Sequence, residues 1–275
     1  MSRTQTDATG QLLATKPAAE REQVQETAIG LLRRSAGELQ KALPRHMPPD
    51  RFARIVLTAI RQTPELAETT PVSFMGSVMQ LAALGLEPNT PLGHAYLIPR
   101  RNSVANREHP ILECTIQIGY KGYVELAARA GASLVAHVVR EGDLFEWCYG
   151  TQERLTHRYS SAPDREDQPI VAAWAKAERK QTPAIFRVLS WGQLEARRKR
   201  SPKADSGPWL QFREAMYQKT AARALEPWIP KTADFARAAW LEDRSELGDR
   251  QSLAFDPDVL DSLSRIGLDP EGASA

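Results

Sequence analysis

The chain has 275 residues, two cysteines and a formal net charge of +2 at neutral pH. This length allows one large domain or two small ones, and it is enough for a sizeable core. Because neither a signal peptide nor an apolar run of membrane-spanning length is present, the sequence argues against a secreted or membrane protein and predicts a reducing cytoplasm. We expect Cys114 and Cys148 to be free thiols with structural roles.

Charge is unevenly distributed along the chain. Residues 241–275 contain nine acidic and three basic residues, a balance of −6, which leaves +8 for residues 1–240. A basic body favours a polyanionic partner, whose binding is driven by release of condensed counterions. A solvated surface with a solubilising acidic tail is the alternative, and charge alone does not exclude it.

The N-terminal part of the chain predicts a weakly ordered segment followed by two helices. Residues 1–25 are polar and small and show no apolar period, so we expect them to be disordered or weakly ordered. Apolar residues at helical spacing predict amphipathic helices at 26–43 and 50–62. We expect both helices to pack on the core and the region before residue 62 to support self-association.

A compact helix–hairpin–helix unit is predicted in the middle of the chain. Thr70 caps its first helix and Gly85 ends it with left-handed backbone. Two strands follow at 93–99 and 111–119, and the second strand alternates apolar and polar residues. A Gly-Tyr-Lys-Gly turn then leads into a second helix at 123–130.

After this unit the spacing of apolar residues changes from the helical period to an alternation at every second residue, which is typical of strands. Short alternating segments predict strands at 134–139, 144–149, 154–159, 170–178 and 185–189. We expect them to form one small, mainly antiparallel sheet. Helices are predicted at 191–200, 209–225 and 232–247.

These elements predict an α+β fold, in which a central β-hairpin and a small sheet are flanked by helices. We expect a single core domain over residues 26–247 that forms oligomers. Residues 248–275 have few apolar groups, so we expect an acidic flexible tail that is dispensable for folding and competes with a polyanion for the basic body.

Seven short motifs occur in a fixed order between residues 40 and 230. They are LPRHM at 43–47, LGLEPNTPLGHAYLIP at 84–99, IGYKGYVELAARAG at 118–131, VVREGDLFEW at 138–147, HR at 157–158, GPW at 207–209 and KTAARAL at 219–225. Together they resemble the RecT family of phage single-strand annealing proteins. An ordered set of motifs is far rarer by chance than any one short motif.

The resemblance implies an ATP-independent protein that binds single-stranded DNA without sequence preference and pairs complementary strands in homologous recombination and DNA repair. It implies rings or helical filaments of identical subunits, no cofactor and no membrane partner. Single-stranded DNA and the annealed duplex are the expected ligands, with a phage exonuclease or a host single-strand binding protein as further candidate partners. A bacterial cytoplasm and a phage or prophage origin fit the same resemblance.

A search for enzyme chemistry supports a protein without a catalytic centre. The chain has no GxxxxGK[ST], HExxH or CxxC motif, and its five histidines are scattered. Glu87, Glu141 and Asp143 offer oxygen ligands for magnesium, but Glu141-Gly142-Asp143 is more typical of a turn. A protein that only coats single strands and a metal-dependent nuclease remain the rival classes.

The candidate DNA-binding residues are cations and one tyrosine. Phosphate contacts are predicted for Arg100, Arg101, Arg107, Lys121, Arg129, Arg197, Arg198, Lys199, Lys219 and Arg223. Tyr120, in the glycine turn, is the candidate for base stacking. Hairpin tips are often only solvated, and the basic run 197–200 can instead satisfy carbonyl groups at a helix end.

Overall fold

The computed structural model describes residues 18–102, 111–180, 182–201, 204–205, 207–225, 228, 233–247, 251 and 257–268. Arg107 lies outside these residues, as do residues 1–17 of the segment 1–25 that was predicted to be weakly ordered. Residues 18–25 of that segment are helical, so the prediction is wrong for them. Helix α1 begins at Ala18, earlier than the predicted start at residue 26.

The N-terminal helices are α1 (Ala18–Arg34), α2 (Ala36–Ala42) and α3 (Pro49–Gln62), followed by the short η1 (Pro64–Glu68). The predicted helix at 26–43 is divided at Ser35, whose buried hydroxyl donates to the Leu31 carbonyl at 2.8 Å. A serine that bonds back four residues bends a helix.

The apolar faces of these helices are used inside the chain. Leu31, Leu39, Phe52 and Val56 are buried in the main core cluster. They are therefore not available to another copy of the chain, and the predicted self-association through these faces is not supported.

The central unit has the predicted order of elements, but its second helix begins at Tyr120 and not at residue 123. Helix α4 (Pro71–Leu84) begins with Thr70, whose hydroxyl accepts from the Ser73 N–H at 3.3 Å, and ends at Gly85 with φ of 60°. Strands β1 (Ala95–Asn102) and β2 (Ile111–Ile118) pair antiparallel, and α5 (Tyr120–Arg129) follows.

The later strands lie where the alternation places them, but they form two sheets. They are β3 (Ala132–Arg140), β4 (Leu144–Cys148), β5 (Arg154–Arg158), β6 (Ile170–Arg179) and β7 (Thr182–Ser190), with η2 (Arg165–Asp167) before β6. The sheet order is β3-β6-β7, while β4 and β5 pair only with each other. Phe145 and Leu155 of this hairpin pack on the Val139 and Trp174 side chains of the larger sheet, so the hairpin adds to a face and not to an edge.

Five helices complete the fold: α6 (Trp191–Arg198), α7 (Pro208–Gln211), α8 (Arg213–Leu225), α9 (Ala233–Leu247) and α10 (Pro257–Arg265). The predicted helix at 209–225 breaks at Phe212, where φ is −131° and ψ is 47°. The break leaves the Phe212 side chain 63% exposed.

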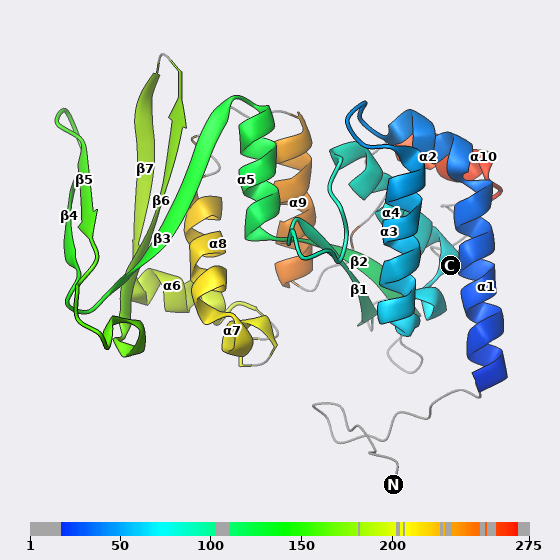
Figure 1. The fold of residues 1–275 in the computed structure, drawn as a ribbon, viewed down its shortest axis with the longest axis horizontal. Helices are drawn as coiled ribbons and strands as arrows, with labels where there is room; N and C mark the ends of the chain where they lie inside the picture. Colours follow the sequence, from blue (N-terminus) through cyan, green and yellow to red (C-terminus); the bar gives the residue numbers. More distant parts are fainter. Residues whose placement is uncertain are drawn as a thin grey trace, which may run out of the picture.

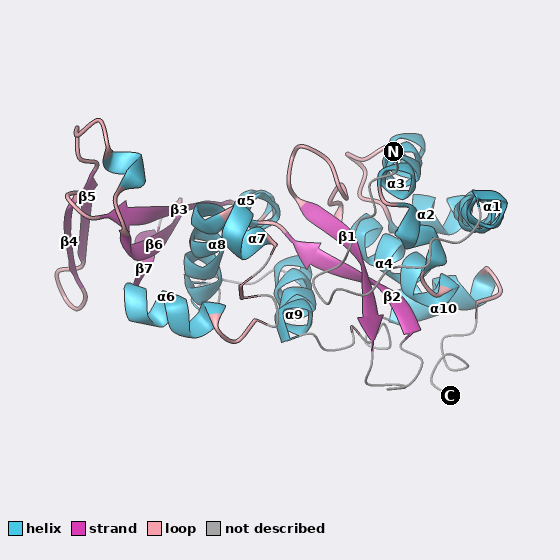
Figure 2. Ribbon diagram, turned by 90° about the horizontal axis from the view of Figure 1, so that it is seen from below, coloured by secondary structure: helices cyan, strands magenta, loops and turns pink. Residues whose placement is uncertain are grey.

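The elements form an elongated molecule (Figure 1). The β3-β6-β7 sheet and the β4–β5 hairpin lie at one end, and α1–α4 with β1–β2 lie at the other, with α5 and α9 between them (Figures 1 and 2). One continuous cluster of buried apolar side chains extends from α1 to α10. The fold is therefore a single α+β domain, as predicted.

Part of the predicted flexible tail is packed against the core. Gln251 is buried, and its amide both accepts from the Ile116 N–H and donates to the Ile116 carbonyl, each at 2.6 Å. Leu263 of α10 is fully buried. The expected flexibility is wrong for these residues. Gln251 needs no apolar pattern, because its side-chain amide completes an open strand edge, whereas Leu263 belongs to a short amphipathic helix.

Two further features bear on the sequence predictions. Cys114 and Cys148 are free, and burial raises the pKa of Cys114 to about 12, whereas Cys148 is exposed. In the described part of the chain, no helix has both the length and the hydropathy needed to cross a membrane.

Candidate nucleic-acid interface

The Gly-Tyr-Lys-Gly segment forms the N-cap and first turn of α5, and it is shaped by close approach of two backbone segments. The Gly119 N–H donates to the His94 carbonyl at 2.9 Å, and a Cβ at Gly122 would lie 2.2 Å from the same oxygen. Only glycine fits such an approach. The turn leaves Lys121 exposed beside β1.

Tyr120 in the same turn faces the protein. Its ring packs on the core, and its hydroxyl accepts from the Ala136 N–H at 2.8 Å. Burial raises the pKa of this phenol. Tyr120 therefore joins α5 to β3, and the ring is not presented for base stacking.

The hairpin arginines have different surroundings. Arg101 is exposed on β1, whereas Arg100 is partly buried and donates to the Ser245 carbonyl of α9. Burial lowers the pKa of Arg100, and the Glu242 carboxylate opposes that effect. Arg100 thus connects the hairpin to α9, and Arg101 is the hairpin cation that faces solvent among the two described.

Arg129 completes the C-terminal end of α4. Its guanidinium donates to the Leu84 carbonyl at 2.7 Å and to the Gly85 carbonyl at 2.8 Å. It also pairs with Glu125 at 3.0 Å. This is the helix-end role in which a cation satisfies terminal carbonyls.

Lys219 and Arg223 lie one turn apart on α8, and both meet acids of α9. Lys219 is 4% exposed and is paired with the buried Glu242. Arg223 is paired with Asp243, whose side chain is 61% exposed. The structure does not offer Lys219 to a ligand, and Arg223 lies at the surface with a carboxylate beside it.

The basic run at the end of α6 is also divided in its roles. Arg198 pairs with Glu195 at 2.9 Å and with Asp205 at 2.7 Å, and these acids raise its pKa. Arg197 donates to the Thr220 carbonyl of α8 at 3.3 Å. Lys199 and Arg200 are exposed.

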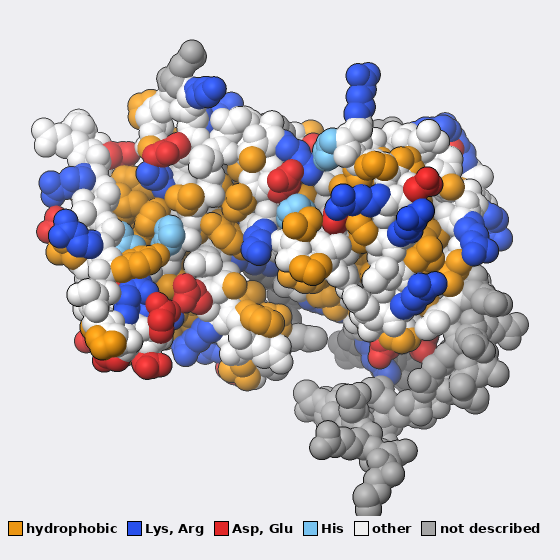
Figure 3. Space-filling model, viewed as in Figure 1, with side chains coloured by type: hydrophobic (Ala, Val, Ile, Leu, Met, Phe, Trp, Pro, Cys, Tyr) orange, Lys and Arg blue, Asp and Glu red, His pale blue; other side chains and the backbone are white. Residues whose placement is uncertain are grey.

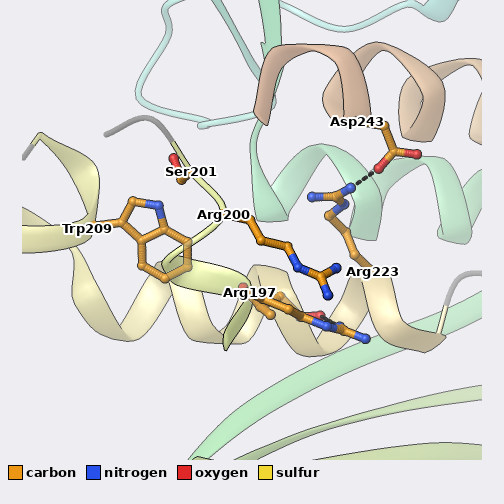
Figure 4. Close-up of a pocket in the computed structure, with 7 residues that line it drawn as sticks. Arg197, Arg200, Ser201, Trp209, Arg223 and Asp243 are labelled. Carbon is orange, nitrogen blue, oxygen red and sulfur yellow. Dashed lines mark hydrogen bonds and ion pairs between the residues drawn. The ribbon is translucent and has the colours of Figure 1, made fainter. Parts of the chain in front are cut away.

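Three of these cations surround one pocket of about 440 Å³ (Figure 4). Arg197, Arg200 and Arg223 direct their guanidinium groups toward the same space. The other lining residues are Ser201, Trp209, Thr220 and Asp243. Guanidinium groups bind phosphate through paired hydrogen bonds, so this pocket has the chemistry of a phosphate site.

Two sets of surface residues were not predicted as site residues. Arg51, Arg54 and Arg61 lie on the solvent side of α3, and Figure 3 shows basic side chains gathered over that end of the molecule. Their spacing of three and seven residues places them on one helical face, a signal present in the sequence. Arg200 was within the predicted basic run but was not selected.

Exposed aromatic side chains lie beside β7. Trp228 is 56% exposed with the Arg187 guanidinium 4.4 Å from its ring centre, and Trp147 is 48% exposed. Tyr149 stacks on Phe186 with ring centres 5.0 Å apart. Single exposed tryptophans carry no helical or strand period, so the sequence pattern does not distinguish them from core residues.

The Glu141-Gly142-Asp143 segment is a turn, as its composition indicates. Gly142 has φ of 87°, and the Asp143 N–H donates to the Arg140 carbonyl at 3.1 Å. The Asp143 carboxylate is buried and accepts from Arg165 and from His157. Within the described residues, no group of three or more His, Cys, Asp or Glu side chains is placed to hold a metal ion.

Comparison with known proteins identifies the family. The family model described as "RecT family" matches residues 50–252. The chain is 39% identical over 212 residues to Protein RecT of Escherichia coli (strain K12), covering 76% of this chain and 77% of that protein. It is 27% identical over 217 residues to the protein YqaK of Bacillus subtilis (strain 168), covering 77% and 70% respectively. The chain therefore belongs to the RecT family of DNA-binding, single-strand annealing recombination proteins.

Proposed function

We propose that this protein anneals complementary single strands without ATP and that it does so as an oligomer assembled on DNA. The observation that carries the DNA-binding part is the convergence of Arg197, Arg200 and Arg223 around one surface pocket. Arg197 belongs to α6, Arg200 to the turn that follows it and Arg223 to α8, and all three line the same pocket. Arg101, Lys121 and Lys199 add exposed positive charge.

The proposed mode of binding uses the phosphate backbone. Cations that touch phosphates and not base edges bind every sequence about equally. They also leave the base edges free for a second strand. Each matched step then gains roughly 1.4 kcal/mol, the typical stacking free energy of a duplex step. A run of matches therefore needs no nucleotide hydrolysis.

Base stacking is the second proposed contribution. Trp228 and Trp147 are two exposed rings: Arg187 of β7 lies against Trp228, and Trp147 lies beside Tyr149, which stacks on Phe186 of β7. An aromatic side chain that stacks on a base contributes roughly 1–3 kcal/mol and tolerates any base. These rings replace Tyr120 as the proposed stacking positions.

Assembly follows from the proposed activity. A subunit with a few phosphate contacts binds weakly, and many subunits on one strand gain affinity through their linkage. Because the apolar faces of α1–α3 are internal, the contact between subunits is proposed to use other surfaces. Partner nucleases and single-strand binding proteins remain proposals from the family resemblance alone.

One assay separates this function from its rivals. Two complementary oligonucleotides carrying a fluorescence donor and acceptor are mixed with the protein in buffer without nucleotide. Faster pairing supports annealing, whereas unchanged or slower pairing with tight binding supports a coating protein. Shortened strands on a denaturing gel support a nuclease.

A further inference from the structure

The Arg197–Arg200–Arg223 pocket contains an acid as well as three arginines. Asp243 reaches the pocket from α9 and pairs with Arg223 (Figure 4). Its side chain is 61% exposed, while that of Arg223 is 18% exposed. The carboxylate is thus the more solvent-exposed member of the pair, and it occupies Arg223 at the pocket that the other two arginines line.

The neighbouring acid of α9 shows what a structural ion pair looks like in this fold. Glu242 is fully buried, pairs with Lys219 and accepts from the Ile118 N–H of β2 at 2.6 Å. Because its partners are buried, Glu242 cannot leave without exposing unpaired groups. The exposed Asp243 has no such constraint.

Helix α9 is held at several points that do not involve Asp243. Arg100 donates to the Ser245 carbonyl, and Gln251 donates to the Leu241 carbonyl at 2.7 Å. Phe235 is buried against Tyr123 of α5, with ring centres 5.5 Å apart. The helix therefore keeps Asp243 at the pocket rim whether or not the carboxylate is bound to Arg223.

We propose that Asp243 is an internal competitor for DNA phosphate at Arg223. A carboxylate and a phosphate bind a guanidinium through the same paired geometry, and an exposed ion pair is worth little. A phosphodiester held nearby by Arg197 and Arg200 displaces the carboxylate, and Arg223 changes partner without becoming unpaired. This inference rests on the proposed DNA binding. It predicts that the cost of breaking the Asp243–Arg223 pair lowers the affinity of the wild-type protein for DNA.

The test compares two substitutions that remove the same charge from the same helix. Asp243→Asn removes the competitor, and Asp234→Asn removes an exposed acid from the first turn of α9. Binding to a fluorescent oligothymidylate is measured by anisotropy with the full chain at about 50 and about 300 mM salt. Asp243→Asn should bind roughly two- to fivefold more tightly at low salt, the range expected for one exposed ion pair. The gain should shrink at high salt, and Asp234→Asn should stay near wild type.

A second pair of proteins tests whether the effect of Asp243 depends on Arg223. In an Arg223→Ala background, adding Asp243→Asn should produce no further gain, because the arginine that the carboxylate occupies is absent. A gain that persists there, or an equal gain from Asp234→Asn, would show a general charge effect and overturn the proposal. So would an Asp243→Asn protein that binds no more tightly than wild type.

The outcomes also separate this inference from the proposed function. A wild-type protein that does not bind the oligonucleotide refutes both. A wild-type protein that binds and anneals, beside an Asp243→Asn protein of unchanged affinity, refutes only the competitor. Thermal melting of each variant confirms that the compared proteins are equally folded.

Discussion

Lys219 of α8 and Glu242 of α9 form an ion pair with both side chains buried, and Glu242 also accepts from the Ile118 N–H of β2. The consecutive helices α8 and α9 and the sequence-distant strand β2 are therefore joined at one carboxylate. A residue predicted to contact DNA instead holds the helices and the hairpin together. This relationship separates the two cations of α8 that were predicted to contact DNA, Lys219 and Arg223, into one structural and one surface residue.

The first prediction concerns that pair. Lys219→Met should destabilise the protein by about 3 kcal/mol, because Glu242 would remain buried without its counter-charge. The free energy of unfolding is measured by urea titration. Adding Glu242→Gln should recover much of the loss, since the glutamine oxygen can still accept from Ile118. If Lys219→Met leaves the stability unchanged but reduces the salt dependence of DNA binding, then Lys219 contacts DNA and is not a structural residue.

The second prediction concerns the basic pocket. Arg197→Ala and Arg200→Ala should each weaken single-strand binding on every sequence and lower the salt slope by roughly 0.7, the value for one phosphate contact on a single strand. Binding is measured on two oligonucleotides of different sequence over a series of salt concentrations. The matched control is Lys180→Ala, an exposed cation in the turn between β6 and β7. An equal change of slope in the control would mean that charge, and not position, determines binding.

The third prediction concerns the turn that follows β3. Burial alone would raise the pKa of Asp143, but hydrogen bonds from Arg165, from the N–H groups of Arg140 and Ser160, and from His157 hold it well below its usual range. Asp143→Asn should therefore cost about 3 kcal/mol at neutral pH. Glu166→Gln, on an exposed side chain that pairs with the same Arg165, is the control and should cost little.

The sign of the pH dependence follows from the lowered pKa. The stabilisation from the Asp143 carboxylate is complete above the unfolded pKa, about 3.9, and is lost as pH falls through the folded value. The melting temperatures of wild type and Asp143→Asn should thus differ by a constant amount from pH 5 to 8 and converge only below about pH 4. Convergence already near pH 6 would assign the stabilisation to a histidine.

The fourth prediction concerns the C-terminal segment. Ending the chain after residue 247 should lower the melting temperature, because Gln251 would no longer pair with the backbone of Ile116 and the buried Leu263 would be absent. Gln251→Ala alone should cost about 2 kcal/mol, as three backbone groups, the N–H and carbonyl of Ile116 and the carbonyl of Leu241, lose this partner. Ending the chain after residue 268 keeps all these contacts and should leave the melting temperature unchanged. If both truncated proteins and Gln251→Ala melt at the wild-type temperature, the C-terminal segment is dispensable for folding after all.

The periodicity of the sequence predicts where helices and strands occur, but it does not predict which of them pack against one another. Thr70 and Gly85 are local signals, and each lies where the sequence places it. The separate β4–β5 hairpin depends on Phe145 and Leu155 packing across a face, which alternation cannot distinguish from edge pairing. Phe212 ends a helix that its neighbours would continue.

The candidate site illustrates the same limit at the level of single residues. A sequence shows that Lys219 and Arg223 share a helical face, but it does not show that α9 covers one and borders the other. Tyr120 has the local context of an exposed turn, yet its hydroxyl meets a backbone N–H of β3. Long-range contacts decide whether a cation is structural or available, so the basic pocket could only be found in three dimensions.

The most direct test of the proposed function is the annealing rate of wild type beside the Arg197→Ala/Arg200→Ala double variant in nucleotide-free buffer. Donor- and acceptor-labelled complementary oligonucleotides are mixed by stopped flow with each protein, and with Lys180→Ala as the control. The account predicts that wild type and the control pair the strands faster than the spontaneous rate and that the double variant loses most of this acceleration while melting normally. A wild-type protein that leaves the spontaneous rate unchanged, or a double variant that anneals as fast as wild type, would contradict it.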